Sequence, residues 1–271
     1  MTANALPFDK LAAGYDIEFT HSAIGQLQRR RVWQYLQPLL DGYNHPVRIL
    51  EINCGTGEDA LRLAALGHSV IATDASAMMV EEAKKKMIHT NSNPAPDFVV
   101  CPFNQLEQMF SGQKFDLVFS NFGGLNCIDA DELRELGNSF NRLLNPAGKL
   151  FLTLMSDFCL REIIYYGARL QWAKAFRRWK PAAIFSADGV DMPVYYYRPG
   201  KIKNLLAVNF RIMAKHPVGL FIPPSYLEKG YANRQPQLQR LCRLEERLAA
   251  PWTSRFADHY CLLFNKREEQ P

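Results

Sequence analysis

The chain has 271 residues, of which 48% are hydrophobic and 22% charged, and its formal net charge is +5. These values are typical of a globular protein with a sizeable core, and the length suits one α/β domain with a large insertion. The basic residues are scattered, which argues against nucleic-acid binding. The six cysteines have no paired spacing, which argues against a metal site, and no apolar run is long enough to span a membrane. We therefore expect a cytoplasmic protein.

An N-terminal helical segment is the first predicted element. Residues 8–16 lead into a helix that contains three consecutive arginines, Trp33 and Leu36. Tyr15 and Trp33 can serve as amphipathic anchors that pack this helix on the edge of a sheet. Residues 1–45 are therefore expected to form a helical cap.

A buried strand, a glycine turn and a helix follow at residues 47–59, and Asp74 ends the next predicted strand. This order forms the nucleotide-binding half of an α/β sheet, in which the acid hydrogen-bonds ribose hydroxyls. Three carboxylates, Glu51, Glu58 and Asp59, surround the place where a pyrophosphate would bind. Because S-adenosylmethionine has no phosphate and carries two cationic groups, the charge pattern favours it as the cofactor.

Further strands and helices continue the alternation. Ser76 can cap the helix after the second strand, and residues 97–101 predict a third strand. Residues 115–120 predict a central strand that ends beside Asn121 and the Gly123-Gly124 pair, where open α/β sheets bind their ligands. Residues 143–152 predict a turn and a fifth strand.

Residues 47–155 as a whole resemble the class I S-adenosylmethionine-dependent methyltransferases, whose first motif reads acid-x-Gly-x-Gly-x-Gly. Glu51, Asn53, Gly55 and Gly57 stand at those places. Asn53 can replace a glycine because asparagine tolerates left-handed backbone conformations. The resemblance implies a Rossmann-like methyltransferase fold with a seven-stranded, mostly parallel sheet, helices on both faces, a reversed final strand and a substrate-covering insertion.

The resemblance also implies the residues of the cofactor site. Asp74 would bind both ribose hydroxyls, and Met79 would pack on the adenine, although Met79 is equally plausible as a core residue. Asn104 stands near the usual place of an acid and can accept the adenine amino hydrogen bond. An aromatic residue in the position of Tyr15 often lies over the cofactor. The expected cofactor-binding set is Tyr15, Glu51, Asn53, Cys54, Gly55, Asp74, Ala75, Met79, Phe103, Asn104, Ser120 and Asn121.

Residues 156–235 do not follow the core pattern, and we expect them to cover the substrate as a lid. Residues 158–179 predict one basic, aromatic helix, which can lie on a membrane interface, although a lid helix is the favoured interpretation. Residues 192–198 predict an inserted strand. Its residues Tyr195 and Tyr197 can stack on a flat acceptor or serve as ordinary strand residues.

Residues 210–221 predict a further strand region near the end of the lid segment. Residues 236–271 are then expected to return to the core. Within them, residues 237–249 predict a helix with leucines at helical spacing, and residues 258–264 predict the final strand. His259, beside Asp258, is a candidate general base, with a purely structural histidine as the alternative. Asn126 is the second candidate catalytic residue, because the segment after the central strand would lie beside the reacting centre.

The predicted protein is a single-domain methyltransferase that acts on a small-molecule substrate, with no metal and no nucleic-acid partner. A lipid or quinone methyltransferase is the second interpretation. A cofactor-binding regulatory or scaffold protein without turnover is the third. Asn53, the missing adenine acid and Ala147, which replaces a glycine of the family's turn before the fifth strand, leave that third interpretation open.

Overall fold

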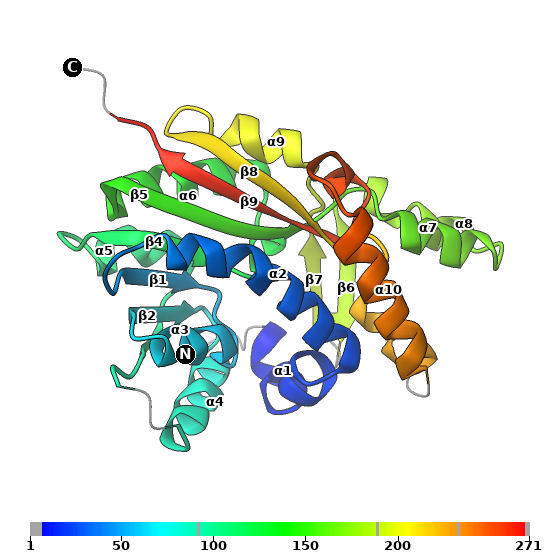
Figure 1. Ribbon diagram of the computed structural model, residues 1–271, viewed down its shortest axis with the longest axis horizontal. Helices are drawn as coiled ribbons and strands as arrows, with labels where there is room; N and C mark the ends of the chain where they lie inside the picture. The colour runs from blue at the N-terminus through cyan, green and yellow to red at the C-terminus, as the bar shows by residue number, and fades with distance from the viewer. Residues whose placement is uncertain (1–6, 91–92, 188–189, 232–233, 269–271) are drawn as a thin grey trace.

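The computed structural model describes residues 7–90, 93–187, 190–231 and 234–268. Seven strands form one sheet in the order β3-β2-β1-β4-β5-β9-β8 (Figure 1). Strands β1 to β5 run parallel, and β9 lies antiparallel between β5 and β8. The strands are β1 (Arg48–Ile52), β2 (Ser69–Asp74), β3 (Asp97–Val100), β4 (Phe115–Ser120), β5 (Leu144–Met155), β8 (Phe210–Val218) and β9 (His259–Lys266). This arrangement confirms the predicted α/β fold and its reversed final strand.

Helices cover both faces of the sheet, so the central strands are buried on both sides, as parallel sheets require. Leu50 and Ile52 of β1 belong to the apolar cluster that includes residues of α5, α6 and α9. Ile49, on the opposite face, packs with residues of α2, α3 and α4. These helices are α2 (Ala23–Asp41), α3 (Glu58–Ala65), α4 (Ala77–Ile88), α5 (Leu106–Met109), α6 (Ala130–Leu143) and α9 (Pro199–Leu205).

The N-terminal cap lies against the carboxyl ends of the strands. It consists of α1 (Pro7–Tyr15), the π-helix η1 (Asp16–Thr20) and α2, and α1 contacts α4 and β7. The carboxylate of Asp16 accepts hydrogen bonds from Thr56 and Lys86, which joins the cap to the glycine turn and α4. Residues 1–6 of the predicted cap lie outside the described residues.

The helix predicted over residues 158–179 is interrupted. The segment forms α7 (Leu160–Gly167), α8 (Trp172–Ala175) and the 3-10 helix η4 (Arg177–Trp179). The chain turns at Leu170, whose φ is 57°, and the Gln171 N–H returns to the Tyr166 carbonyl. Gly167 leaves room for the Trp172 ring and has little helix propensity, so periodicity alone missed the break.

The predicted inserted strand is shorter than expected and starts earlier. Strand β7 (Val190–Val194) pairs with β6 (Ala183–Ala187) in a separate hairpin, which residues 195–198 have already left. Strand β8 falls inside the segment 156–235 but is an edge strand of the main sheet, so that segment is not wholly an insertion. The strand region predicted over residues 210–221 is confirmed as β8, and its pairing with β9 places it in the main sheet.

The final helix, α10 (Gln235–Leu248), buries only part of the leucine pattern that predicted it. Leu238, Cys242 and Glu245 face inward, whereas Leu244 and Leu248 are exposed. Glu245 is buried because its carboxylate accepts hydrogen bonds from the backbone N–H groups of residues 219, 221 and 222. The remaining 3-10 helices are η2 (Phe103–Gln105), η3 (Gly124–Cys127), η5 (Ser225–Gly230) and η6 (Pro251–Arg255).

Candidate active site

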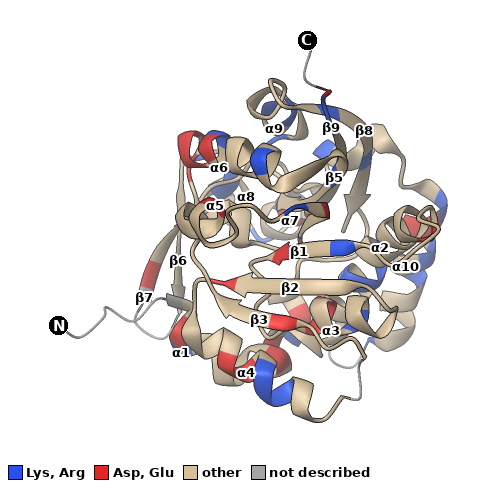
Figure 2. Ribbon diagram, turned by 90° about the vertical axis from the view of Figure 1, so that its left-hand side faces the viewer, with Lys and Arg blue, Asp and Glu red and all other residues tan. Residues whose placement is uncertain are grey.

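A cavity of about 890 Å³ opens at the carboxyl ends of the parallel strands. Figure 2 shows acidic residues at the ends of β1 and β2, on the edge that faces α1 and β7. Eight predicted cofactor-site residues line the cavity: Tyr15, Asn53, Gly55, Asp74, Ala75, Met79, Phe103 and Asn104. Other described lining residues come from α1, β7 and α6, and the charged and polar wall that α6 supplies was not indicated by the sequence motifs.

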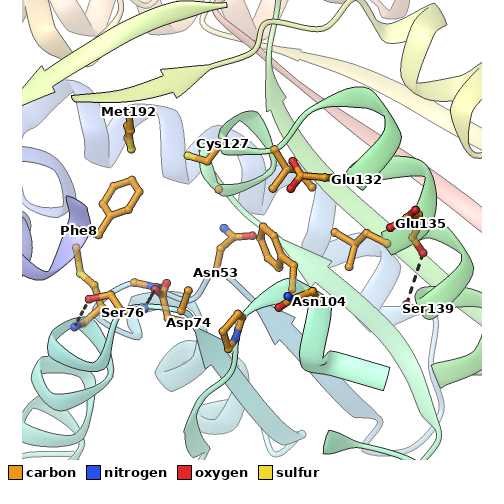
Figure 3. A pocket seen from close by; sticks show the side chains of 18 of the residues that line it. Phe8, Asn53, Asp74, Ser76, Asn104, Cys127, Glu132, Glu135, Ser139 and Met192 are labelled. Atoms are coloured by element: carbon orange, nitrogen blue, oxygen red, sulfur yellow. Dashed lines mark hydrogen bonds between the residues drawn. The ribbon is translucent and has the colours of Figure 1, made fainter. Parts of the chain in front are cut away.

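Asp74, at the end of β2, is held by the backbone on both sides of its carboxylate. Its two oxygens accept hydrogen bonds from the N–H groups of Gly55 and Ser76, each at 2.9 Å. Ser76 caps the N-terminus of helix α4 as predicted, because its hydroxyl accepts a hydrogen bond from the Met79 N–H at 3.1 Å. Burial raises the pKa of Asp74, and the two backbone bonds oppose that rise. The carboxylate is therefore a fixed acceptor on the cavity wall (Figure 3).

Asn53 occupies the left-handed conformation expected at this position, with φ of 51°. Its amide oxygen accepts from the Ser120 hydroxyl at 2.6 Å, and its amide nitrogen donates to the Asn121 carbonyl at 2.8 Å. A Cβ on Gly124 would lie 2.4 Å from the side chain of Asn53, so this glycine is needed for the close approach. Ser120 and Asn121 are not among the described lining residues, and they support Asn53 from behind.

Apolar and amide groups line the end of the cavity that adjoins β3. Met79 is almost fully buried, and Pro102, Phe103 and Asn104 follow β3 along the wall. Figure 3 shows Asn104 facing the same space as Asn53 and Asp74. A flat ring system fits this end, where an amide is the polar partner at its edge.

The three carboxylates near the glycine turn do not form the open acidic cluster that was predicted. Asp59 pairs with Arg29 and also accepts from Trp33 and Asn121. Glu58 pairs with Lys86 at 3.2 Å. Burial, together with nearby Asp59, holds the pKa of Glu51 well above its usual range.

Neutralisation therefore removes most of the negative charge on which the choice against pyrophosphate was based. Glu51 and Cys54 are not among the described cavity-lining residues. Cys54 packs instead in the apolar cluster with α3. The partners that neutralise the acids come from α2 and α4, which the local motif does not reveal.

Tyr15 ends α1 and lines the cavity beside Gly55. A Cβ on Gly55 would lie 3.7 Å from the Tyr15 ring. Burial raises the pKa of Tyr15 to about 12, so its hydroxyl stays neutral and can donate a hydrogen bond near neutral pH. The ring closes the cavity over the glycine turn.

The opposite end of the cavity is apolar. Phe8, Phe122, Cys127, Met192 and nearby Pro193 line it, and Figure 3 shows Phe8, Cys127 and Met192 around one open space. Phe122 has φ of 44°, and the imidazole of His259 packs edge-on against its ring at 5.2 Å. Phe122 therefore projects into the site from a constrained turn.

His259 and Asn126 are not brought to the described cavity wall. His259 lies behind Phe122, and its Nδ1 is 3.1 Å from the carboxylate of Asp258. Asn126 is fully buried and bonds the backbone of Met155 and Tyr195. These contacts support structural roles, in which Asn126 joins η3 to β5 and to the chain after β7.

Tyr195 and Tyr197 are likewise away from the described wall of the cavity. Tyr197 is buried and donates from its hydroxyl to the Ile128 carbonyl at 2.6 Å, while Tyr195 packs against the core. Met192 and Pro193 are the described residues of 156–235 that reach the cavity. Alternation within a strand cannot distinguish these positions, because the contacts of the hairpin with η3 and α1 decide which residues face the site.

Two whole-chain expectations concern metals and membranes. No group of histidine, cysteine and acidic side chains that could hold a metal ion occurs in residues 7–90, 93–187, 190–231 and 234–268. Over the same ranges, no helix is both long and apolar enough to cross a lipid bilayer.

Comparison with known proteins identifies a domain similarity. Residues 49–148 match the model of a methyltransferase domain. This span runs from β1 to the start of β5 and includes the glycine turn, Asp74 and the central strand. Over this span the chain is similar to methyltransferase domains, in agreement with the predicted resemblance to class I S-adenosylmethionine-dependent methyltransferases.

The relatives that this chain matches are distant in sequence. The chain is 30% identical over 95 residues to a tRNA 5-carboxymethoxyuridine methyltransferase of Escherichia coli, covering 35% of this chain and 36% of that protein. Over 146 residues it is 30% identical to a 2-phytyl-1,4-naphtoquinone methyltransferase of Nostoc, covering 52% of this chain and 60% of the relative. The chain thus matches from about a third to three fifths of these relatives' lengths.

A solved structure confirms the fold over almost the whole chain. The CcbJ methyltransferase of Streptomyces caelestis aligns with a TM-score of 0.63 at 15% identity and covers 98% of this chain and 100% of its own. The methyltransferase fold therefore includes the α1 cap and the strands after β5, which lie beyond the matched domain segment.

Proposed function

We propose that this protein transfers a methyl group from S-adenosylmethionine to a small organic acceptor. The observation that carries the proposal is the two-part cavity. Asp74, Asn53 and Asn104 line its polar part, and Phe8, Phe122 and Met192 line an adjoining apolar part. Its volume of about 890 Å³ lies near the upper end of the usual range of about 300–1,000 Å³, which suits two adjacent ligands.

The residues present fit the cofactor. Asp74 offers a buried carboxylate suited to ribose hydroxyls, Met79 and Phe103 suit the two sides of an adenine, and Asn104 suits its amino group. Gly55 leaves space for the methionine part of the cofactor beneath Tyr15.

Methyl transfer by this site would rest on orientation more than on a dedicated base. The cofactor supplies an electrophilic methyl group on a sulfonium. The rings of Phe8 and Phe122, with Met192, would exclude water and hold the acceptor atom in line with that methyl group. Holding the two reacting atoms close together and aligned is the source of the rate enhancement. No histidine is among the described lining residues. In this proposal His259 supports the ring of Phe122, against which its imidazole packs, and does not contact the acceptor.

A quinone or lipid-like acceptor is the second candidate. The apolar walls favour it, and the Nostoc relative is named for a naphthoquinone substrate. The name of the Escherichia coli relative makes an RNA acceptor a separate outcome to be tested. An acceptor panel should therefore contain small phenols and amines, a demethylated naphthoquinone and tRNA.

Isothermal titration should show binding of S-adenosylmethionine and S-adenosylhomocysteine but not of NAD. The expectation rests on the polar part of the cavity around Asp74 and on the shortage of cations for a pyrophosphate, because Arg142, the cation among the described lining residues, is paired with Glu107. Micromolar NAD binding without S-adenosylmethionine binding would refute the proposed cofactor.

Met192→Ala should change acceptor use while leaving S-adenosylhomocysteine affinity within about threefold. Met192 lines the apolar end, and loss of such a contact reduces kcat/KM by roughly 10-fold or more. Formation of S-adenosylhomocysteine against the acceptor panel is the measurement.

Ile184→Ala is the matched control, because Ile184 lies on the same hairpin and is exposed. Equal effects of the two substitutions would count against Met192 in the acceptor site. Cofactor binding without product from any acceptor would favour the regulatory or scaffold interpretation.

A further inference from the structure

Helices α7 and α8 project from the body of the protein, beyond the end of the main sheet (Figure 1). The segment carries large apolar side chains that face solvent. The exposed fractions are 57% for Ile164, 77% for Leu170, 54% for Trp172 and 59% for Trp179. None of residues 158–180 is among the described residues that line the 890 Å³ cavity, so this surface is separate from the proposed methyl-transfer site.

The same projection is strongly basic. Residues 158–180 contain six cations and one carboxylate, and that carboxylate, Glu162, is buried against Arg177 and Arg178. Its negative charge is therefore unavailable at the surface. Because Arg177 and Arg178 are themselves paired and Arg178 is buried, the exposed cations Arg169, Lys174 and Lys180 set the potential of the projection.

A smaller cavity, of about 380 Å³, lies at the base of the projection. Trp179 forms part of its wall, together with four exposed cations: Lys180, Arg198, Lys201 and Arg255. Asp157 is the carboxylate among the described lining residues, and it pairs with Arg198 at 3.1 Å. This basic pocket beside an apolar projection is complementary to an anionic headgroup beside an acyl chain.

We propose that the projection, defined here as residues 158–180 with the adjoining basic pocket, docks this protein on an anionic phospholipid surface. Tryptophan and long aliphatic side chains enter the interfacial region, while Lys and Arg remain with the headgroups. Clustered cations add electrostatic attraction to anionic lipid. Exposed Ile164 and Leu170 favour a lipid over RNA, because aliphatic side chains offer no face for base stacking.

Flotation of the full chain with lipid vesicles tests this surface. The protein should bind vesicles of phosphatidylcholine mixed with phosphatidylglycerol, bind pure phosphatidylcholine weakly, and dissociate as salt is raised. Tryptophan fluorescence should shift to the blue on binding, because Trp172 and Trp179 leave water.

Two substitutions separate the apolar and the electrostatic contributions. Leu170→Asn removes the most exposed apolar tip and suits the left-handed backbone at this position, where φ is 57°. Lys180→Glu reverses a cation of the basic pocket. Lys180→Glu should weaken vesicle binding by about tenfold or more, because one interfacial Lys or Arg contributes about 1 kcal/mol, a factor of roughly five, and the reversal also adds a repulsion. Leu170→Asn should weaken binding to neutral and anionic vesicles alike, because it removes apolar surface that inserts into the interface.

Matched controls lie on α4, which Figure 1 places far from α7 and α8. Ile88→Asn and Lys84→Glu make the same chemical changes at exposed positions and should leave vesicle binding unchanged. Asp74→Ala should also bind vesicles normally, which separates membrane docking from cofactor binding. Equal binding to neutral and anionic vesicles, tight binding to RNA instead, or self-association through Leu170 would overturn the proposal.

Discussion

Arg178→Met should destabilise the fold by about 3–5 kcal/mol, the usual cost of leaving buried charges without their partner. Arg178 is 4% exposed, and its guanidinium contacts the carboxylates of Glu162 and Asp258 at 2.7 and 2.5 Å. It also donates to the carbonyls of Ser156 and Asp258, each at 3.1 Å. Methionine fills part of the volume but satisfies none of these acceptors.

Equilibrium unfolding in urea at neutral pH measures the effect of this substitution. Arg198→Met is the control, because Arg198 forms an exposed ion pair with Asp157, is itself 60% exposed and should cost less than about 1 kcal/mol. Similar losses in the two variants would contradict the assigned importance of the buried network.

The pH dependence of stability provides an independent check on the same network. Burial alone would raise the pKa of Asp258, but the charges of His259 and Arg178 outweigh it and hold that pKa well below its usual range. A depressed pKa stabilises the fold above the unfolded value of about 4 and loses that contribution as pH falls below it. Wild-type stability should therefore decline on acidification, and Arg178→Met should show a smaller decline.

Asp74→Ala should weaken S-adenosylhomocysteine binding by about 1.5–3 kcal/mol, or roughly 10- to 150-fold, through loss of charge-assisted hydrogen bonds. The carboxylate lines the cavity at the end of β2, where ribose hydroxyls would complete its hydrogen bonding. Isothermal titration gives the dissociation constant, and circular dichroism checks that the variant is folded.

Asp97→Ala is the matched control for this substitution. Asp97 begins β3, beside the strand that Asp74 ends, and its side chain is exposed away from the cavity. Its loss should leave the dissociation constant unchanged. A folded Asp74→Ala variant with wild-type affinity would refute the ribose-binding role.

Local sequence was sufficient for the elements that line the proposed cofactor site. Strand β1, the left-handed Asn53 and Asp74 at the end of β2 each depend on residues that are close in the chain. The Ser76 cap is equally local. Parallel strands place their carboxyl ends at one edge, so a correct order of strands and turns already brings these groups together.

Tertiary contacts decided the charge of the site and the shape of its acceptor end. Asp59 is neutralised by Arg29 of α2, and Met192 reaches the cavity because the β6–β7 hairpin packs near η3 and α1. His259 is held behind Phe122 by the packing of β9 against β5. Each of these outcomes depends on partners that are 30 or more residues away, and no local periodicity or motif specifies such partners.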